Sequence, residues 1–129
     1  MTDPTRRSTI DDLIHAWLTA RAERDLDRLG MLTASDAVWH SPVEGAQVGR
    51  SAVVNEVRRG FEKADSFETM TLDVRCDATS AAARVRNTAT RGDKRLDSTQ
   101  TLYLKTDRGV VSEVRIQVDD PTAVEEFWA

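Results

Sequence analysis

Two side chains of this sequence, His40 and Asp119, could transfer a proton in an enzyme reaction. Imidazole exchanges a proton most easily near neutral pH, and carboxylates are common catalytic bases. Each residue also has a structural interpretation. Alternation along a strand turns His40 outward if Ser41 faces the interior, and Asp119 stands beside Asp120, where a helix cap is needed. Proton transfer therefore requires at least one of the two candidates to reach an interior pocket.

Other kinds of reactive site lack the residues that they need. Cys76 is the single cysteine, so an intramolecular disulfide and a multi-thiolate metal site are both excluded. A role as a small core residue is expected for it. The sequence contains no glycine-rich phosphate loop and no cluster of His and carboxylate residues at metal-binding spacing. No nucleotide, metal or other cofactor is implied.

Charge and hydropathy exclude two classes of partner. Acidic residues outnumber basic residues by 22 to 18, and the two signs alternate along the chain. A nucleic-acid-binding face needs clustered Lys and Arg, so no nucleic acid is expected. The apolar stretches are far shorter than the ~20 residues that cross a bilayer, and no signal-peptide pattern is present. We expect a soluble, cytoplasmic protein without membrane contact, and its preference for Arg over Lys suggests a bacterial source.

Helical spacing of apolar residues characterises the first half of the chain. The length of 129 residues fits one domain, predicted over residues 8–129 after a loose polar leader of residues 1–7. Apolar residues recur every three or four positions in residues 8–23 and again in residues 25–32. A third amphipathic helix is predicted after Gly49.

The period changes to two from Phe67 onward, where four alternating runs are separated by short turns. This pattern predicts an antiparallel meander with one apolar and one polar face. A brief strand is predicted earlier, over residues 36–41. Asp120 and Pro121 supply the N-cap and the first position of a terminal helix.

These elements predict an α+β fold in which the N-terminal helices pack on the apolar face of a curved antiparallel sheet. The outer face of the sheet is polar and includes Tyr103 and Arg115. It is either a solvated surface or the interface of a homodimer.

Four short motifs, in this order along the chain, carry a family resemblance. They are the run Arg24–Leu29, the run Asp36–Pro42, the helix start Gly49–Arg50, and Asp119–Asp120 ahead of Glu126–Trp128. In these motifs the sequence resembles the SnoaL-like polyketide cyclases, ketosteroid isomerases and limonene-epoxide hydrolases of the nuclear-transport-factor-2-like superfamily. The resemblance spans nearly the whole chain. It implies a cone-like, cystatin-like roll, a homodimer, and a small-molecule pocket between the first helix, the short strand and the inner sheet face.

The catalytic residues known in these families are not matched. The resemblance places Ser41, Trp17 and Leu102 where ketosteroid isomerases have a carboxylate base, a phenol and a protonated carboxyl. Positions near Gln100, Leu102 and Ile116 correspond to the two carboxylates and the Arg of limonene-epoxide hydrolases. SnoaL-like cyclases have an acidic base near the position of Leu102. None of these positions carries a charged group, so none of the three mechanisms transfers directly.

The pocket that the resemblance implies is mostly apolar, with a few uncharged polar groups, which suits a flat or apolar ligand. Its expected lining is Trp17, Trp39, Ser41, Met70, Leu72, Val85, Asn87, Gln100, Leu102, Leu104, Val114, Ile116 and Val118. Alternatively, these residues simply fill the cone. The leading hypothesis is a cofactor-independent cyclase, isomerase or hydrolase that acts on a small apolar secondary metabolite. The competing hypotheses are a non-catalytic ligand-binding protein and a scaffold protein that assembles through the outer face.

Overall fold

The computed structural model describes residues 4–42 and 45–129 of the chain. The helices in these residues are α1 (Pro4–Ala22), α2 (Leu26–Met31), α3 (Arg50–Lys63) and α4 (Pro121–Trp128). The strands are β1 (Thr33–Ser41), β2 (Gly45–Val48), β3 (Ser66–Cys76), β4 (Ser80–Arg91), β5 (Lys94–Asp107) and β6 (Val110–Val118). Helix α1 begins at Pro4, inside the segment predicted to be a loose leader, and residues 1–3 of that leader lie outside the described residues.

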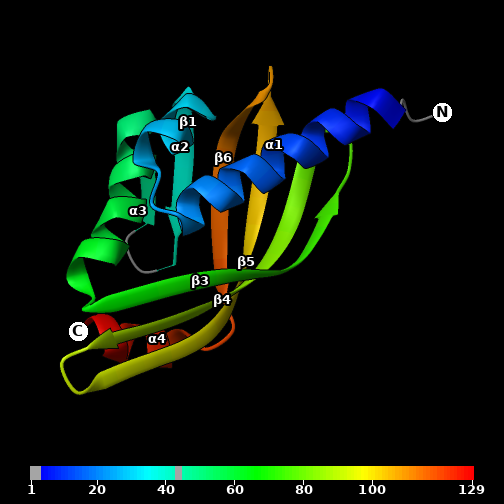
Figure 1. Cartoon of the computed structure of the whole chain (residues 1–129). Helices are drawn as coiled ribbons and strands as arrows, with labels where there is room; N and C mark the ends of the chain where they lie inside the picture. Colours follow the sequence, from blue (N-terminus) through cyan, green and yellow to red (C-terminus); the bar gives the residue numbers. More distant parts are fainter. Residues whose placement is uncertain (1–3, 43–44) are drawn as a thin grey trace.

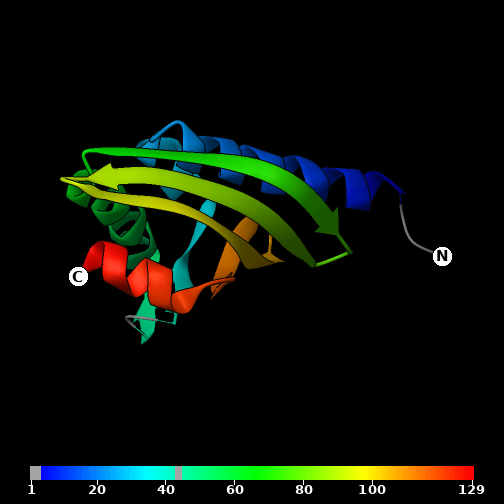
Figure 2. The same cartoon turned by 90° about the horizontal axis from the view of Figure 1, so that it is seen from below.

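The strands form one curved sheet in the order β2-β1-β6-β5-β4-β3. The long strands β3, β4 and β5 bend so that one half of the sheet runs across the other (Figures 1 and 2). The predicted α+β fold of helices on a curved sheet is confirmed. The sheet is mixed, however, because β1 pairs in parallel with β6. That pairing joins strands far apart in the sequence, and alternation within each strand carries no information about it.

Helices α1, α2 and α3 cover the concave face of the sheet, and α4 lies near its lower end (Figure 1). Ile14 and Trp17 of α1 and Val53 of α3 are completely buried, together with Leu102 and Val114 of the sheet. Burial of this apolar stripe stabilises the helices far more than their intrinsic propensity does. A smaller cluster, in which Phe127 of α4 packs with Ala89 and Leu96, holds α4 on β4 and β5.

The caps of two helices follow the sequence pattern. The Asp25 side chain accepts a hydrogen bond from the Arg28 amide at the start of α2, and the Asp120 side chain accepts one from the Ala123 amide at the start of α4. Such caps satisfy amide groups that have no partner within the helix. None of the helices in the described part of the chain is long and apolar enough to cross a membrane.

A β-bulge in β3 reverses the faces of its residues halfway along the strand. Thr71 pairs with Val85 whereas Asp73 pairs with Arg84, so Leu72 is the extra residue. Met70 and Leu72 are therefore 54% and 50% exposed. The prediction that they line the interior is wrong, because strict alternation was assumed through the bulge.

Candidate functional site

A cavity of about 180 Å³ lies between α1, α3, α4 and the inner face of the sheet. An engineered cavity of about 150 Å³ can hold benzene, so this space suits a molecule of one or two rings. Side chains from the three helices and from β1, β3, β4, β5 and β6 surround it. The lining residues are Arg21, Trp39, Ser41, Pro42, Glu56, Val57, Arg59, Gly60, Phe61, Lys63, Phe67, Asn87, Leu96, Ser98, Gln100, Ile116, Val118, Val124 and Trp128.

Aromatic rings form one wall of this cavity. Phe61 and Phe67 meet edge to face with ring centroids 5.1 Å apart, and Phe67 stacks on Trp128 at 6.3 Å. Ring pairs at these separations attract each other. This wall offers apolar ring surface on which a flat molecule can stack.

Three buried polar atoms of lining residues have no hydrogen-bond partner among the described residues. They are the Trp39 Nε1, the Asn87 Oδ1 and the Ser98 Oγ. Asn87 of β4 and Ser98 of β5 are directly paired across the sheet, so their side chains share the inner face. An unpaired buried polar group costs about 1–3 kcal/mol and is rare in native proteins. All three of these atoms belong to residues of the same cavity.

Arg21 places a positive charge at the cavity. Its side chain is 7% exposed, and its Nη1 donates a hydrogen bond of 2.8 Å to the Thr69 hydroxyl. Burial lowers the pKa of the guanidinium to about 10, which leaves it protonated at neutral pH. No carboxylate of the described residues forms an ion pair with it.

The other charged lining residues lie on α3. Glu56 is 10% exposed at its side chain, and its Oε1 is 3.3 Å from the Arg59 Nη1. Lys63 adds another basic group. Three basic residues and one acidic residue therefore line the cavity, and this balance favours anionic over cationic ligands.

The sequence matches the SnoaL-like domain over residues 14–119, which is most of its length. The chain belongs to the SnoaL-like family. No protein of curated function matches the sequence.

Solved structures support this assignment of the SnoaL-like fold. Bal32a, from a soil-derived mobile gene cassette, is 26% identical with a TM-score of 0.91, and the match covers 96% of this chain and 99% of Bal32a. An epoxide hydrolase of the limonene-epoxide hydrolase-like type from Mycobacterium tuberculosis is 16% identical with a TM-score of 0.77, over 94% of this chain and 90% of that one. A protein with a ketosteroid isomerase-like fold from Catenulispora acidiphila is 12% identical with a TM-score of 0.76, over 89% and 91%.

Six of the residues that the sequence assigns to the pocket line the cavity of this SnoaL-like domain: Trp39, Ser41, Asn87, Gln100, Ile116 and Val118. Five others are buried in the hydrophobic core instead: Trp17, Val85, Leu102, Leu104 and Val114. The Trp17 Nε1 donates to the Thr33 hydroxyl, so its hydrogen-bonding capacity is already used. One part of the cone is thus filled by its own side chains, and the part beside α4 is open.

The two predicted acid-base residues, His40 and Asp119, do not line this cavity. The His40 Nε2 lies 3.3 Å from the Glu113 Oε1, because alternation turns His40 away from the face that holds Trp39. Asp119 accepts two hydrogen bonds from Arg84, which hold the pKa of its carboxyl below the usual value.

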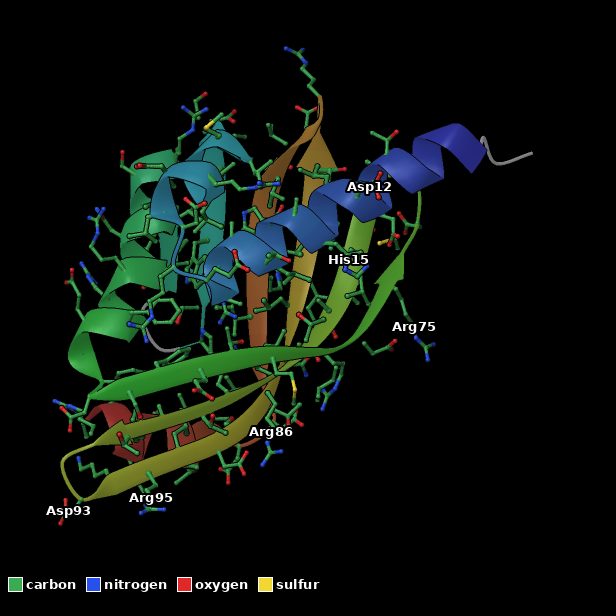
Figure 3. All side chains as sticks on the ribbon, viewed as in Figure 1. Asp12, His15, Arg75, Arg86, Asp93 and Arg95 are labelled. Atoms are coloured by element: carbon green, nitrogen blue, oxygen red, sulfur yellow. The ribbon has the colours of Figure 1, made fainter. Side chains whose placement is uncertain are left out.

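Basic residues of the β4–β5 hairpin have structural roles as well. Arg86 and Arg95 point away from the covering helices, and Asp93 marks the hairpin tip (Figure 3). Arg91 and Lys94 donate to main-chain carbonyls at the end of α4, where positive charge is favourable. Solvation and helix capping account for this cluster.

Sequence reasoning missed Arg21 and Glu56. A signal for Arg21 was present, because it follows Trp17 by four residues and so lies on the same face of α1. Arg21 was nevertheless not assigned to the pocket, because charged side chains are normally expected at the solvent-exposed surface. Glu56 adjoins Val57 on α3, and only the packing of α3 across the cavity reveals its position.

Proposed function

We propose that the cavity binds a small, largely apolar organic molecule. The supporting observation is that the unpaired Trp39 Nε1, Asn87 Oδ1 and Ser98 Oγ all belong to residues that line one cavity. A ligand that supplies hydrogen-bond partners offsets the cost of burying these three atoms. The indole can only donate and the Asn87 oxygen can only accept, so the ligand carries both an acceptor and a donor.

The apolar walls define the body of this ligand. Phe61, Phe67 and Trp128 supply ring surface, and Leu96, Ile116 and Val118 supply aliphatic surface. A site built in this way holds a flat ring system by area burial and orients it by a few hydrogen bonds.

A second candidate function is proton-transfer catalysis of the cyclase, isomerase or hydrolase type. It is favoured by Glu56, a titratable residue that lines the cavity, whereas neither His40 nor Asp119 lines it. In this proposal Glu56 acts as the general base or acid, and Arg59 holds it in position. Binding requires only the cavity, whereas catalysis requires Glu56 as well.

Binding is tested by titrating the isotope-labelled protein with indole and 2-naphthol and following amide chemical shifts. We expect both probes to shift the Asn87, Ser98 and Trp39 resonances. The Asn87→Leu variant should bind 2-naphthol more weakly and, without ligand, be more stable by about 1 kcal/mol, since an unpaired group is removed. The control, Thr88→Val, changes the neighbouring outward position. The proposal fails if millimolar probe leaves the cavity resonances unmoved.

Catalysis is tested separately with Glu56→Gln, which keeps the shape and removes the titratable group. A panel of epoxides and β,γ-unsaturated ketones is incubated with both proteins. We expect turnover by the wild type and a loss of at least 100-fold in the variant, with probe binding retained. Turnover that survives the substitution would remove Glu56 from the mechanism.

We also propose that the outer sheet face forms a homodimer. Tyr103 is 43% exposed there, and the same face carries charges of both signs in the pairs Arg84–Asp119 and Arg86–Asp97. A surface with an exposed aromatic ring and balanced charges can complement a second copy of itself.

A further inference from the structure

We propose that the ligand of the cavity carries an anionic oxygen group, a carboxylate or a phenolate, which binds Arg21. This inference rests on the proposed ligand-binding function and adds the chemical class of the ligand. It follows from the hydrogen bonds, charges and burial of Arg21.

The guanidinium of Arg21 has N–H donors that no described residue accepts. Its bond to the Thr69 Oγ1 uses one of the five N–H groups of the side chain, and it makes no other hydrogen bond to the described residues. Arg21 lines the cavity, so the remaining donors are available on that side. A planar guanidinium with several free donors matches the geometry of a carboxylate.

The charge of Arg21 is also uncompensated. Glu56 is the one carboxylate among the described lining residues, and it pairs with Arg59. The Thr69 hydroxyl accepts a hydrogen bond but carries no charge. Burying a cation without a counter-ion is strongly unfavourable, and a bound anion would relieve this.

The unpaired polar atoms belong to residues that line the same cavity as this cation. The Trp39 Nε1 can donate a hydrogen bond to a second oxygen of the ligand, and the Ser98 hydroxyl can donate or accept. Lys63 adds positive charge, so an approaching anion is attracted to the site. A ligand whose ring system packs against Phe67 and Trp128 and whose anionic group binds Arg21 would contact both the aromatic wall and the cation of the cavity.

The inference is tested with two probes of nearly equal shape, naphthalene-2-carboxylate and naphthalene-2-carboxamide. Dissociation constants are measured by calorimetry and amide chemical shifts at pH 7. We expect the carboxylate to bind roughly 10- to 100-fold more tightly, since hydrogen bonds to a charged group are the stronger kind. The Arg21→Met variant should lose this preference. Arg21→Lys keeps the charge and should retain part of it.

Arg58→Met is the matched control, because Arg58 is exposed on α3, donates a hydrogen bond to Asn55 and does not line the cavity. Its preference for the carboxylate should stay within about threefold of the wild type. Arg59→Met tests the competing cation, because Arg59 lines the same cavity with its side chain 57% exposed and paired with Glu56. If Arg21→Met does not fold, Arg21→Lys and Arg59→Met still decide between the two cations.

Each outcome has a distinct meaning. Equal binding of the two probes by the wild type, or an unchanged preference in Arg21→Met, would overturn the inference and leave the proposed binding function standing. A larger loss in Arg59→Met than in the Arg21 variants would move the anion to Arg59 and also overturn it. Failure of both probes to bind at millimolar concentration would overturn the inference and count against the proposed function.

Discussion

The indole nitrogen of Trp17 donates a hydrogen bond of 3.1 Å to the hydroxyl of Thr33, and both side chains are completely buried. The same hydroxyl donates to the Leu29 carbonyl at 2.7 Å. This chain of bonds ties α1 to the end of α2 and the start of β1. It also explains how a large polar ring can be buried in the apolar core.

Replacing Thr33 by Val should lower the free energy of unfolding by about 2–3 kcal/mol, because the Trp17 N–H is left buried and unpaired. Thr33→Ser keeps the hydroxyl and should cost about 1 kcal/mol for the lost methyl. Urea denaturation followed by tryptophan fluorescence measures both values. Equal stability of the two variants would show that the hydrogen bond contributes little.

Replacing Arg21 by Met should stabilise the ligand-free protein by about 1–3 kcal/mol at pH 7. Burial lowers the pKa of Arg21 from its usual value to about 10, so burying the charge penalises folding at every pH below about 10. The penalty declines only as the pH rises above that value. Met fills similar volume without the charge. Denaturation without ligand measures the change, and a variant less stable than the wild type would contradict this account.

Replacing Asp97 and Asp119 together by Asn should destabilise the protein slightly at pH 7 and less at pH 3. Hydrogen bonds from Arg86 and Arg84 lower the pKa of these carboxyls, so their contribution is present above the unfolded value of 3.8 and is lost as the pH falls through the lowered folded values. The effect is small because both ion pairs are exposed. Urea midpoints at the two pH values test it, with Asp93→Asn as the control. A gap as large at pH 3 as at pH 7 would refute the linkage.

Replacing Tyr103 by Glu and Arg115 by Glu should dissociate a homodimer that forms through the outer face. Light scattering after gel filtration gives the mass of the 14.4 kDa chain and of its variants. Binding of naphthalene-2-carboxylate should be unchanged, because neither residue lines the cavity. An unchanged mass in both variants would exclude this face as the interface.

The sequence predicted the fold well because its strongest signals are local. Helical and strand periods located most of the elements, and Asp120 with Pro121 located the start of α4. The parallel pairing of β1 with β6 depends on contacts between distant segments, so it was not predicted. The inward positions of β4, β5 and β6 followed from alternation alone.

The site was predicted less well, for two physical reasons. A buried cation violates the rule by which charged residues are assigned to the surface, so Arg21 was overlooked. Depth along the cone also cannot be read from strand alternation, and Leu102 and Leu104 have the correct face but belong to the filled part. Ser98 shares that face and lines the cavity, yet it was passed over because a small hydroxyl gives a weak signal.

The bulge at Leu72 determines how this domain could be redesigned. Before it, the odd positions Phe67 and Thr69 point inward, and after it, the even positions Val74 and Cys76 do. A mutant library that randomises only the odd positions of β3, or only the even ones, would place about half of its mutations at outward-facing positions. Selection for new ligands should therefore randomise positions 67 and 69 together with Ser98, and leave Leu72 in place.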